Sequence, residues 1–488
     1  MERQQISRLA LASYLLSPAL VVMIVLMVVE AMLAAATTWL VIDAGRKVAE
    51  GQFLLTDLGA ILLTQSASYV AGVISWIFAE RAGYRGFGKF MLRFARENRS
   101  KVKLFNDKLT REQVEPFLTG ETFLCFFNVM YELEFALKLF LGLVFNAAVL
   151  GAEIDRSLPF AYVGAFAVLL FMQWALQKPV ARAYLENQRM NNRITAQGYT
   201  AWDNVFSGNR YNLRLWLAGF KGRLRDGLAA QIRAIVAREG MSAMSGIVSL
   251  AIVFATVTMV AVHNAGNMVL LIALATTLPR QIEMTYDLHL LANGWNDFVA
   301  IWTRFGGVAA NMLPQPAPAF DGRIRFDRLV LREGEHANVV SSVNDALRIV
   351  QAHPTGRINI RGANGTGKSS LLASLKTEIK QRAYYWPPSD RLAFKFAGGM
   401  VPVDVAGDQD DELIVVAESM DRKLGFSTGE RQLKSLEEIV SATDAQVYLL
   451  DEWDANLDAA NKAKAEALIN VLATRARVVE ISHRDRVD

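Results

Sequence analysis

A glycine-rich segment at residues 362–369, GANGTGKS, has the residue types and spacing of a phosphate-binding loop. It matches the pattern G-x-x-x-x-G-K-[ST], whose glycines let backbone N–H groups turn toward a β-phosphate. Residues 357–361 have the pattern of a strand and residues 370–375 that of a helix, whose N-terminus adds partial positive charge. We expect Lys368 to contact the β- and γ-phosphates and Ser369 to bind Mg²⁺. The candidate nucleotide-binding residues here are Gly362, Asn364, Gly365, Thr366, Gly367, Lys368, Ser369 and Ser370.

A second motif pairs two carboxylates with a buried strand. The apolar run 447–450 ends in Asp451 and Glu452. A strand of this kind brings its last residue to the edge of the sheet, beside the phosphate-binding loop. Asp451 would then hold Mg²⁺, directly or through water, and Glu452 would polarise the water that attacks the γ-phosphate.

Two weaker motifs flank the carboxylate strand. The segment 426–432, FSTGERQ, places small hydroxyl residues and a glycine at the start of a helix, which favours either a second anion site or a plain helix cap. The segment 478–483, VVEISH, is typical of a strand that ends in a histidine. His483 could face the γ-phosphate as a second catalytic candidate beside Glu452, or could be structural.

The elements that position these motifs belong to a mixed, charged region at residues 320–488. No run in it is long enough to span a membrane, and we interpret it as a cytosolic α/β domain. Residues 324–331 alternate between apolar and polar side chains, which predicts a strand. Pro314, Pro316 and Pro318 mark a linker over 313–319.

The region before the linker is built for a bilayer. The whole chain of 488 residues is 52% hydrophobic and 20% charged, with a mean hydropathy of +0.21, which excludes intrinsic disorder. Its single cysteine, Cys125, excludes a disulfide framework and a multi-cysteine metal site. Long gaps between charges predict an all-α transmembrane domain over 1–312 with six spanning helices. The six spans are about 12–44, 55–84, 120–151, 157–178, 240–263 and 267–300.

The distribution of Lys and Arg predicts the orientation. Residues 81–111 hold ten of them and residues 178–238 hold eleven, whereas the connectors on the other side hold three. We therefore expect a multi-pass protein of the cytoplasmic membrane, with both termini and the α/β domain in the cytoplasm. This topology also explains the pI of about 9.0, so we do not expect nucleic acid as a partner.

Charged residues inside or near the predicted spans have two interpretations. They could lie on solvated or interfacial helix extensions, or they could line a substrate cavity. The residues concerned are Glu132, Glu134, Lys138, Arg280, Glu283 and Asp287.

The four motifs together resemble the nucleotide-binding domain of an ABC transporter, in the order Walker A, signature, Walker B and histidine switch. Six preceding spans with two basic loops resemble an exporter-type half-transporter, so the resemblance covers nearly the whole chain. It implies a signature at Ser427, Thr428, Gly429 and Glu430 that contacts nucleotide bound by the opposite subunit. It also implies a D-loop at Asp458, coupling helices near 197–203 and 117–121, and ATP and Mg²⁺ as cofactors.

The chain departs from this family in three places. The sequence PPSD stands at residues 387–390, where a Q-loop glutamine is expected. No clear aromatic residue for adenine stacking precedes the loop. The interval of 83 residues from Lys368 to Asp451 is short, which predicts a trimmed helical subdomain.

The resemblance implies a homodimer that hydrolyses ATP to export a peptide-like or hydrophobic substrate by alternating access. Two alternatives stay open. One is a membrane-anchored ATPase that acts on lipid or as a regulator, without solute export. The other is one half of a heterodimeric transporter. The sequence does not identify the substrate.

Overall fold

The computed structural model describes residues 6–52, 54–107, 110–111, 114–115, 117–315, 321–389, 392–394, 396 and 426–482. The chain divides into two compact units, which are described one at a time. The helical unit comprises residues 8–87 and 124–306. The sheet unit comprises residues 1–7, 88–123 and 307–488.

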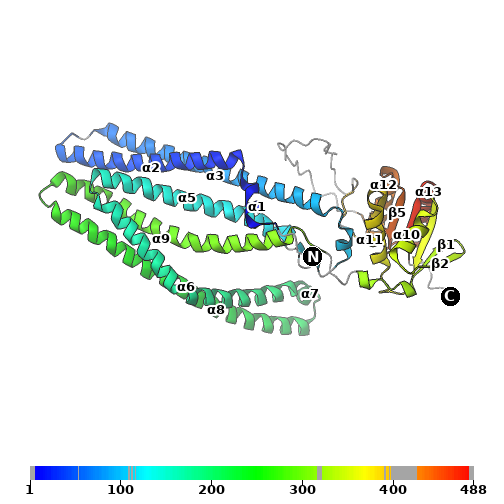
Figure 1. Cartoon of the computed structure of the whole chain (residues 1–488). Helices are drawn as coiled ribbons and strands as arrows, with labels where there is room; N and C mark the ends of the chain where they lie inside the picture. The colour runs from blue at the N-terminus through cyan, green and yellow to red at the C-terminus, as the bar shows by residue number, and fades with distance from the viewer. Residues whose placement is uncertain are drawn as a thin grey trace. The chain divides into compact units, whose positions relative to one another are not determined.

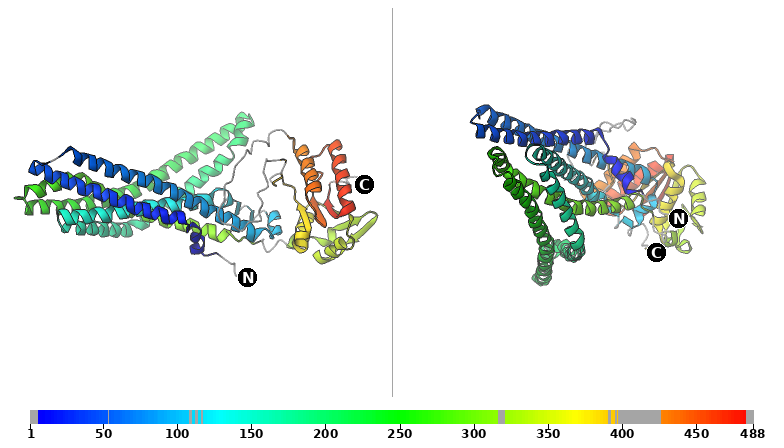
Figure 2. Two further views of the ribbon diagram at one scale, coloured as in Figure 1. Left: turned by 90° about the horizontal axis from the view of Figure 1, so that it is seen from above. Right: turned by 60° about the vertical axis from the view of Figure 1, so that its left-hand side comes forward.

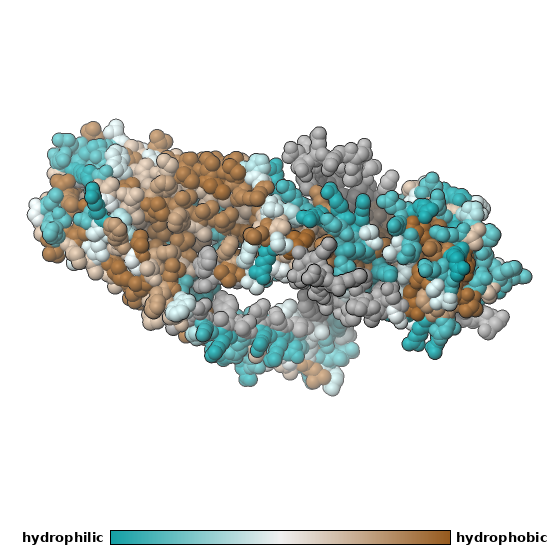
Figure 3. All heavy atoms as spheres, viewed as in Figure 1, coloured by the Kyte–Doolittle hydropathy of each residue, from teal (hydrophilic) through white to brown (hydrophobic). Residues whose placement is uncertain are grey.

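Long helices make up the helical unit, in line with its long apolar segments (Figure 1). After the short α1 (Arg8–Ala12) and η1 (Ser13–Leu15), the long helices are α2 (Pro18–Glu50), α3 (Leu55–Asn98), α5 (Thr122–Glu153), α6 (Ser157–Tyr199), α8 (Arg210–His263) and α9 (Met268–Asn311). Helices α6 and α8 run side by side and diverge from α5 and α9 toward the short α7 (Ala201–Phe206), as Figure 2 shows. Apolar side chains cover a broad surface over α2, α3 and α5 (Figure 3).

Five of the described helices are long and apolar enough to span a membrane, which indicates a membrane protein. They are α2, α3, α5, the segment Ser157–Ala175 of α6, and α8. The prediction of six such spans is therefore confirmed only in part. The sixth segment does form a helix, α9, but its apolar run ends at Leu278, and Pro279, Arg280 and Glu283 follow within one and a half turns.

The sheet unit contains a six-stranded sheet in the order β2-β1-β3-β6-β5-β4. Strands β3, β6, β5 and β4 are parallel, and β1 pairs antiparallel with both β2 and β3. The strands are β1 (Val330–Glu333), β2 (His336–Val339), β3 (Gly356–Arg361), β4 (Ala383–Trp386), β5 (Val447–Asp451) and β6 (Arg477–Ile481). The predicted strands at 357–361 and 447–450 and the helix at 370–375 are confirmed.

Helices cover both faces of the sheet, because the two-residue period of each strand divides its apolar side chains between them. Leu449 of β5 faces a core shared with α10 (Val343–Gln351) and α11 (Lys368–Ile379). Tyr448 and Leu450 face a second core with α12 (Thr428–Ala442) and α13 (Ala459–Arg475). Each residue of β5 and β6 is buried, as expected for central parallel strands.

The strand predicted at 324–331 is wrong for most of its length. Residues Phe326–Arg328 form the 3₁₀ turn η5, and β1 begins only at Val330. Another 3₁₀ turn, η4, spans Asp321–Arg323. This segment packs its backbone against the glycine-rich loop instead of pairing in the sheet: the Arg325 N–H donates to the Thr366 carbonyl at 2.9 Å.

Candidate functional site

The loop of residues 362–367 connects β3 to α11, so the strand–loop–helix order expected of a phosphate-binding loop is present. Its backbone requires glycine at two positions. Gly365 and Gly367 have φ of +81° and +90°, the left-handed region that other residues rarely adopt. A Cβ at Gly367 would also lie 2.6 Å from the Arg323 carbonyl oxygen. The loop therefore packs closely against the backbone of residues 323–325.

The side chains at the end of this loop reach its own carbonyls and the carboxylate strand. Lys368 Nζ donates to the Gly362 carbonyl at 2.7 Å. Ser369 Oγ donates to Asp451 Oδ1 at 3.1 Å, so the candidate metal ligands of two distant motifs meet. Thr366 is buried, and its hydroxyl donates to the Ala363 carbonyl at 2.8 Å, which stabilises the turn.

Asp451 lies at the buried end of β5. Burial raises the pKa of its carboxyl group to about 6, and the nearby Glu452 carboxylate adds to this rise, while the hydrogen bond from Ser369 opposes it. The Tyr385 hydroxyl donates to Asp451 Oδ2 at 3.4 Å. Burial also raises the pKa of Tyr385, so its hydroxyl keeps its proton and remains a donor. Asp451 is thus a desolvated carboxylate that a bound cation would stabilise.

Glu452 sits in a backbone conformation that the fold imposes. Its φ is +50°, which is uncommon for a residue with a side chain. Two contacts hold the loop around it. Gln432 of α12 donates to the Trp453 carbonyl at 2.8 Å, and the Trp453 indole Nε1 donates to Glu480 Oε2 at 2.8 Å. Trp453 is buried, so it anchors the turn that presents Glu452.

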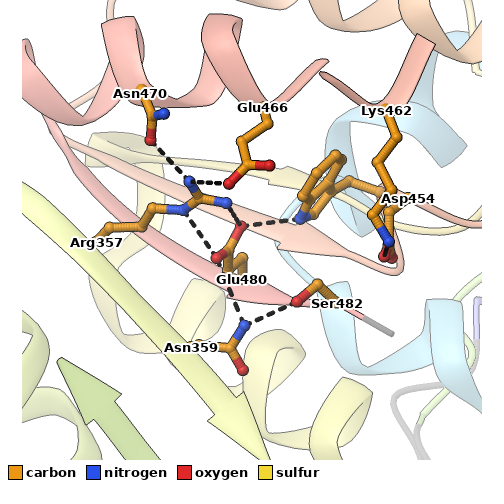
Figure 4. Close-up of polar contacts among 9 residues, drawn as sticks. Arg357, Asn359, Asp454, Lys462, Glu466, Asn470, Glu480 and Ser482 are labelled. Atoms are coloured by element: carbon orange, nitrogen blue, oxygen red, sulfur yellow. Dashed lines mark hydrogen bonds and ion pairs between the residues drawn. The ribbon is translucent and has the colours of Figure 1, made fainter. Parts of the chain in front are cut away.

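A polar network around Glu480 supports that anchor from β6 (Figure 4). Arg357 of β3 binds Glu480 through two nitrogens, at 2.8 and 3.0 Å. Asn359 donates to Ser482 Oγ at 2.8 Å and so fixes the chain just before His483. His483 itself lies outside the described residues. Nearby, Asp454 pairs with Lys462 at 2.8 Å, which ties the turn to α13.

The segment resembling the signature begins α12 with a reciprocal cap. Ser427 Oγ accepts from the Glu430 N–H at 3.2 Å, and the Ser427 N–H donates to Glu430 Oε2 at 2.8 Å. Gly429 packs closely on the turn after β5, since a Cβ there would lie 2.7 Å from the Asn456 carbonyl oxygen. Within the described part of the chain, no hydrogen bond joins residues 427–430 to the loop 362–369.

The residue expected in the D-loop has a structural role in this chain. Asp458 is the N-cap of α13, and its carboxylate accepts from the Asn461 N–H at 2.7 Å. Asn364 is exposed in the loop, and Ser370 lies in the first turn of α11. The other candidate residues lie in the loop from Gly362 to Gly367 and in the first two positions of α11, Lys368 and Ser369.

The side chains that meet here fit a magnesium–nucleotide ligand. A serine hydroxyl and a carboxylate are the hard oxygen ligands that Mg²⁺ takes, usually with water and substrate phosphates completing its shell. Within the described ranges, no group of three or more His, Cys, Asp or Glu side chains could hold a metal ion by itself.

Two contributors to the site were missed by sequence reasoning. Tyr385, in β4, contacts Asp451, and Asn106, in the 3₁₀ turn η2 (Val102–Asn106), contacts both Tyr385 and the backbone of Ser369. No local pattern marks either residue, because each is defined by a contact between segments far apart in the chain. The predicted first coupling region, at Phe117–Glu121, forms the short π-helix η3, which leads directly into α5.

The helical unit holds a second candidate site, a cavity of about 560 Å³ between α5, α8 and α9. Three carboxylates, Glu132, Glu239 and Asp297, line it together with a single guanidinium, Arg238. Arg238 approaches Asp297 at 3.5 Å and Glu239 at 3.7 Å. Glu132 has no hydrogen bond or ion pair with any described residue. The lining therefore carries an excess of negative charge.

One wall of this cavity is a hydrogen-bonded network. Ser242 Oγ and His289 Nε2 are 2.6 Å apart, and Asn293 Nδ2 donates to Ser242 Oγ at 3.1 Å. Gln173 of α6 extends the network by donating to Asn293 Oδ1 at 3.1 Å. Tyr131, Phe135 and Tyr286 add aromatic surface to the lining.

The chain was compared with protein-family models and with curated proteins. No protein-family model matches the chain, and no curated protein matches it.

Proposed function

We propose that this chain is a membrane-bound, ATP-driven translocase of the exporter type that works as a homodimer. The observation that carries the proposal is the 3.1 Å contact between Ser369 and Asp451, which joins a glycine-rich loop to a buried carboxylate in a chain with long apolar helices. The basic loops support an orientation with the nucleotide site in the cytoplasm.

The residues of the site then have distinct roles. Backbone N–H groups of 362–369 and Lys368 would bind the phosphates, and Ser369 and Asp451 would hold Mg²⁺, which would neutralise phosphate charge. Glu452 accepts a proton from the attacking water as general base. The fixed turn around Trp453 keeps that carboxylate oriented.

The exposed aromatic pair on α7 supports coupling to transport. Trp202 and Phe206 are 71% and 70% exposed, with ring centroids 4.5 Å apart. Apolar rings exposed in the loop between two long helices are suited to dock on another protein surface. We propose that they dock on an ATPase domain, in line with the coupling helix expected at 197–203.

Replacing Glu452 by Gln tests the catalytic assignment. We expect the reconstituted E452Q chain to bind ATP as the wild type does but to hydrolyse it about 100-fold or more slowly, because the general base is lost. Glu437→Gln, on an exposed position of α12, is the matched control and should hydrolyse ATP normally. ATPase activity in E452Q equal to that of the control would overturn the role of Glu452.

Two measurements separate export from its alternatives. ATP-dependent accumulation of a substrate in inside-out vesicles supports export, whereas intact ATPase without accumulation of any tested peptide or lipid favours a membrane-anchored regulator. Native mass measurement of the purified protein distinguishes a homodimer from a chain that requires a second, different subunit.

A further inference from the structure

The segment that follows α3 packs against the start of α11 within the sheet unit. It comprises η2 and Asp107. Asp107 is fully buried, and its carboxylate accepts from Thr110 Oγ1 at 2.7 Å and pairs with Arg323 at 3.3 Å. Phe105 meets the Tyr385 ring edge-to-face, with centroids 6.3 Å apart. The segment is therefore fixed by both charge and packing.

Asn106 makes two hydrogen bonds with a defined direction. Its Nδ2 donates to the Ser369 carbonyl at 3.0 Å and to the Tyr385 hydroxyl at 3.2 Å. A carbonyl oxygen only accepts, so the amide nitrogen, not the amide oxygen, must face Ser369. Since the Tyr385 hydroxyl accepts from Asn106, its single proton is available for Asp451 Oδ2, 3.4 Å away. The bonds thus run from Asn106 to Tyr385 to Asp451.

We propose that Asn106 and Tyr385 form a positioning relay that holds Asp451 and Ser369 in register and transmits their arrangement to segment 102–107. The inference rests on the nucleotide site of the proposed function. It adds the contacts through which segment 102–107 responds to the arrangement of Ser369 and Asp451. Both Asp451 and Ser369 are candidate Mg²⁺ ligands, and Asn106 is bonded to the backbone of one and, through Tyr385, to the carboxylate of the other. Any reorientation of either ligand therefore changes a bond in the relay.

Two adjacent tyrosines provide a matched test. Tyr385→Phe removes only the hydroxyl and keeps the ring against Phe105. Tyr384→Phe, the control, changes the neighbouring ring, which packs against Tyr448 in the other core. Asn106→Leu keeps the approximate size of Asn106, removes both donors and adds no charge.

Binding of a fluorescent ATP analogue to the full chain in nanodiscs, titrated with Mg²⁺, is the first readout. We expect the Mg²⁺ concentration for half-maximal binding to rise about tenfold in Tyr385→Phe and Asn106→Leu, because a charge-assisted hydrogen bond contributes roughly that factor. Binding without Mg²⁺ should be unchanged, and Tyr384→Phe should behave as the wild type. A merely structural role would weaken binding with and without Mg²⁺ alike.

Hydrogen exchange of the backbone amides of residues 102–107 is the second readout. In the wild type we expect Mg²⁺ with the ATP analogue to slow exchange there, and in both relay variants this dependence should disappear. Equal behaviour of Tyr385→Phe and Tyr384→Phe, with a wild type that binds nucleotide, overturns the relay and leaves the proposed function standing. A wild type that binds no nucleotide overturns both.

Discussion

At the scale of residues, buried charge in the sheet unit is neutralised by partners from distant strands. Arg477, at the start of β6, is 1% exposed, and its Nη2 donates to Glu333 Oε2 of β1 at 2.7 Å. The Arg477 hydrogen bond holds the pKa of Glu333 below its ordinary value. Without its carboxylate partner, the buried guanidinium would lose the charge interaction that offsets the free-energy cost of its desolvation.

Replacing Glu333 by Gln should therefore destabilise the sheet unit by about 2 kcal/mol at pH 7. Because the pKa of Glu333 is lowered in the folded state, its stabilising contribution is present above the unfolded pKa near 4.5 and is lost as the pH falls through the folded value. The difference between the variant and the wild type should shrink accordingly below about pH 4.5.

Thermal unfolding of the detergent-solubilised chain, followed at pH 7 and at pH 4, measures this difference. Glu335→Gln, in the exposed turn between β1 and β2, serves as the control and should leave the unfolding temperature unchanged. A pH-independent effect of Glu333→Gln would contradict an electrostatic origin.

At the scale of elements, the start of α12 has to satisfy helix capping and is also compatible with binding a ligand. The N-terminus of α12 was open to two interpretations, an anion site or a plain cap, and the structure shows the capping box between Ser427 and Glu430. A capped N-terminus still carries the free N–H groups of its first turn, so a ligand from a second subunit remains compatible with it. Gly429 is required for the close approach of α12 to Asn456.

The cavity between α5, α8 and α9 predicts selectivity for the charge of a bound ligand. Its carboxylates outnumber its guanidinium, and its aromatic rings suit a flat cation, so we expect rhodamine 6G to bind in preference to the anion fluorescein. Glu132→Gln should weaken rhodamine 6G binding about fivefold, because it removes the carboxylate that has no partner among the described residues.

Fluorescence polarisation of the dye with the nanodisc-embedded chain, without ATP, tests this prediction independently of hydrolysis. Glu50→Gln, at the end of α2, is the control acid outside the cavity. Equal dye affinity in Glu132→Gln and Glu50→Gln would exclude Glu132 from the binding site.

At the scale of the whole molecule, the distribution of charge predicts how the chain is oriented in the membrane. The positive-inside rule predicts that the connector after α8 is extracellular and that the α7 region is cytoplasmic. In a Cys125→Ala background, the Asn267→Cys variant, changed in the connector after α8, should react with a membrane-impermeant maleimide in intact cells. The Ser207→Cys variant, changed just after α7, should react only after permeabilisation. The reverse pattern would invert the orientation.

Much of this molecule follows from local sequence. The phosphate-binding pattern at 362–369, the apolar strand before Asp451 and the long uncharged helices are all readable because a strand, a helix or a tight turn depends on neighbours within a few residues. The apolar portions do not mark the ends of the helices, since α3, α6 and α8 continue well past them.

Only the tertiary structure determined the contacts that complete the candidate site. Asn106 and Tyr385 are 279 residues apart, and Trp453, just after β5, reaches Glu480 of the neighbouring strand β6. The turn at 326–328 replaced a strand that alternation predicted, because its backbone packs on the loop instead of on a strand. Such features depend on which segments meet in space, and a hydrogen bond between distant segments leaves no periodic trace in the sequence.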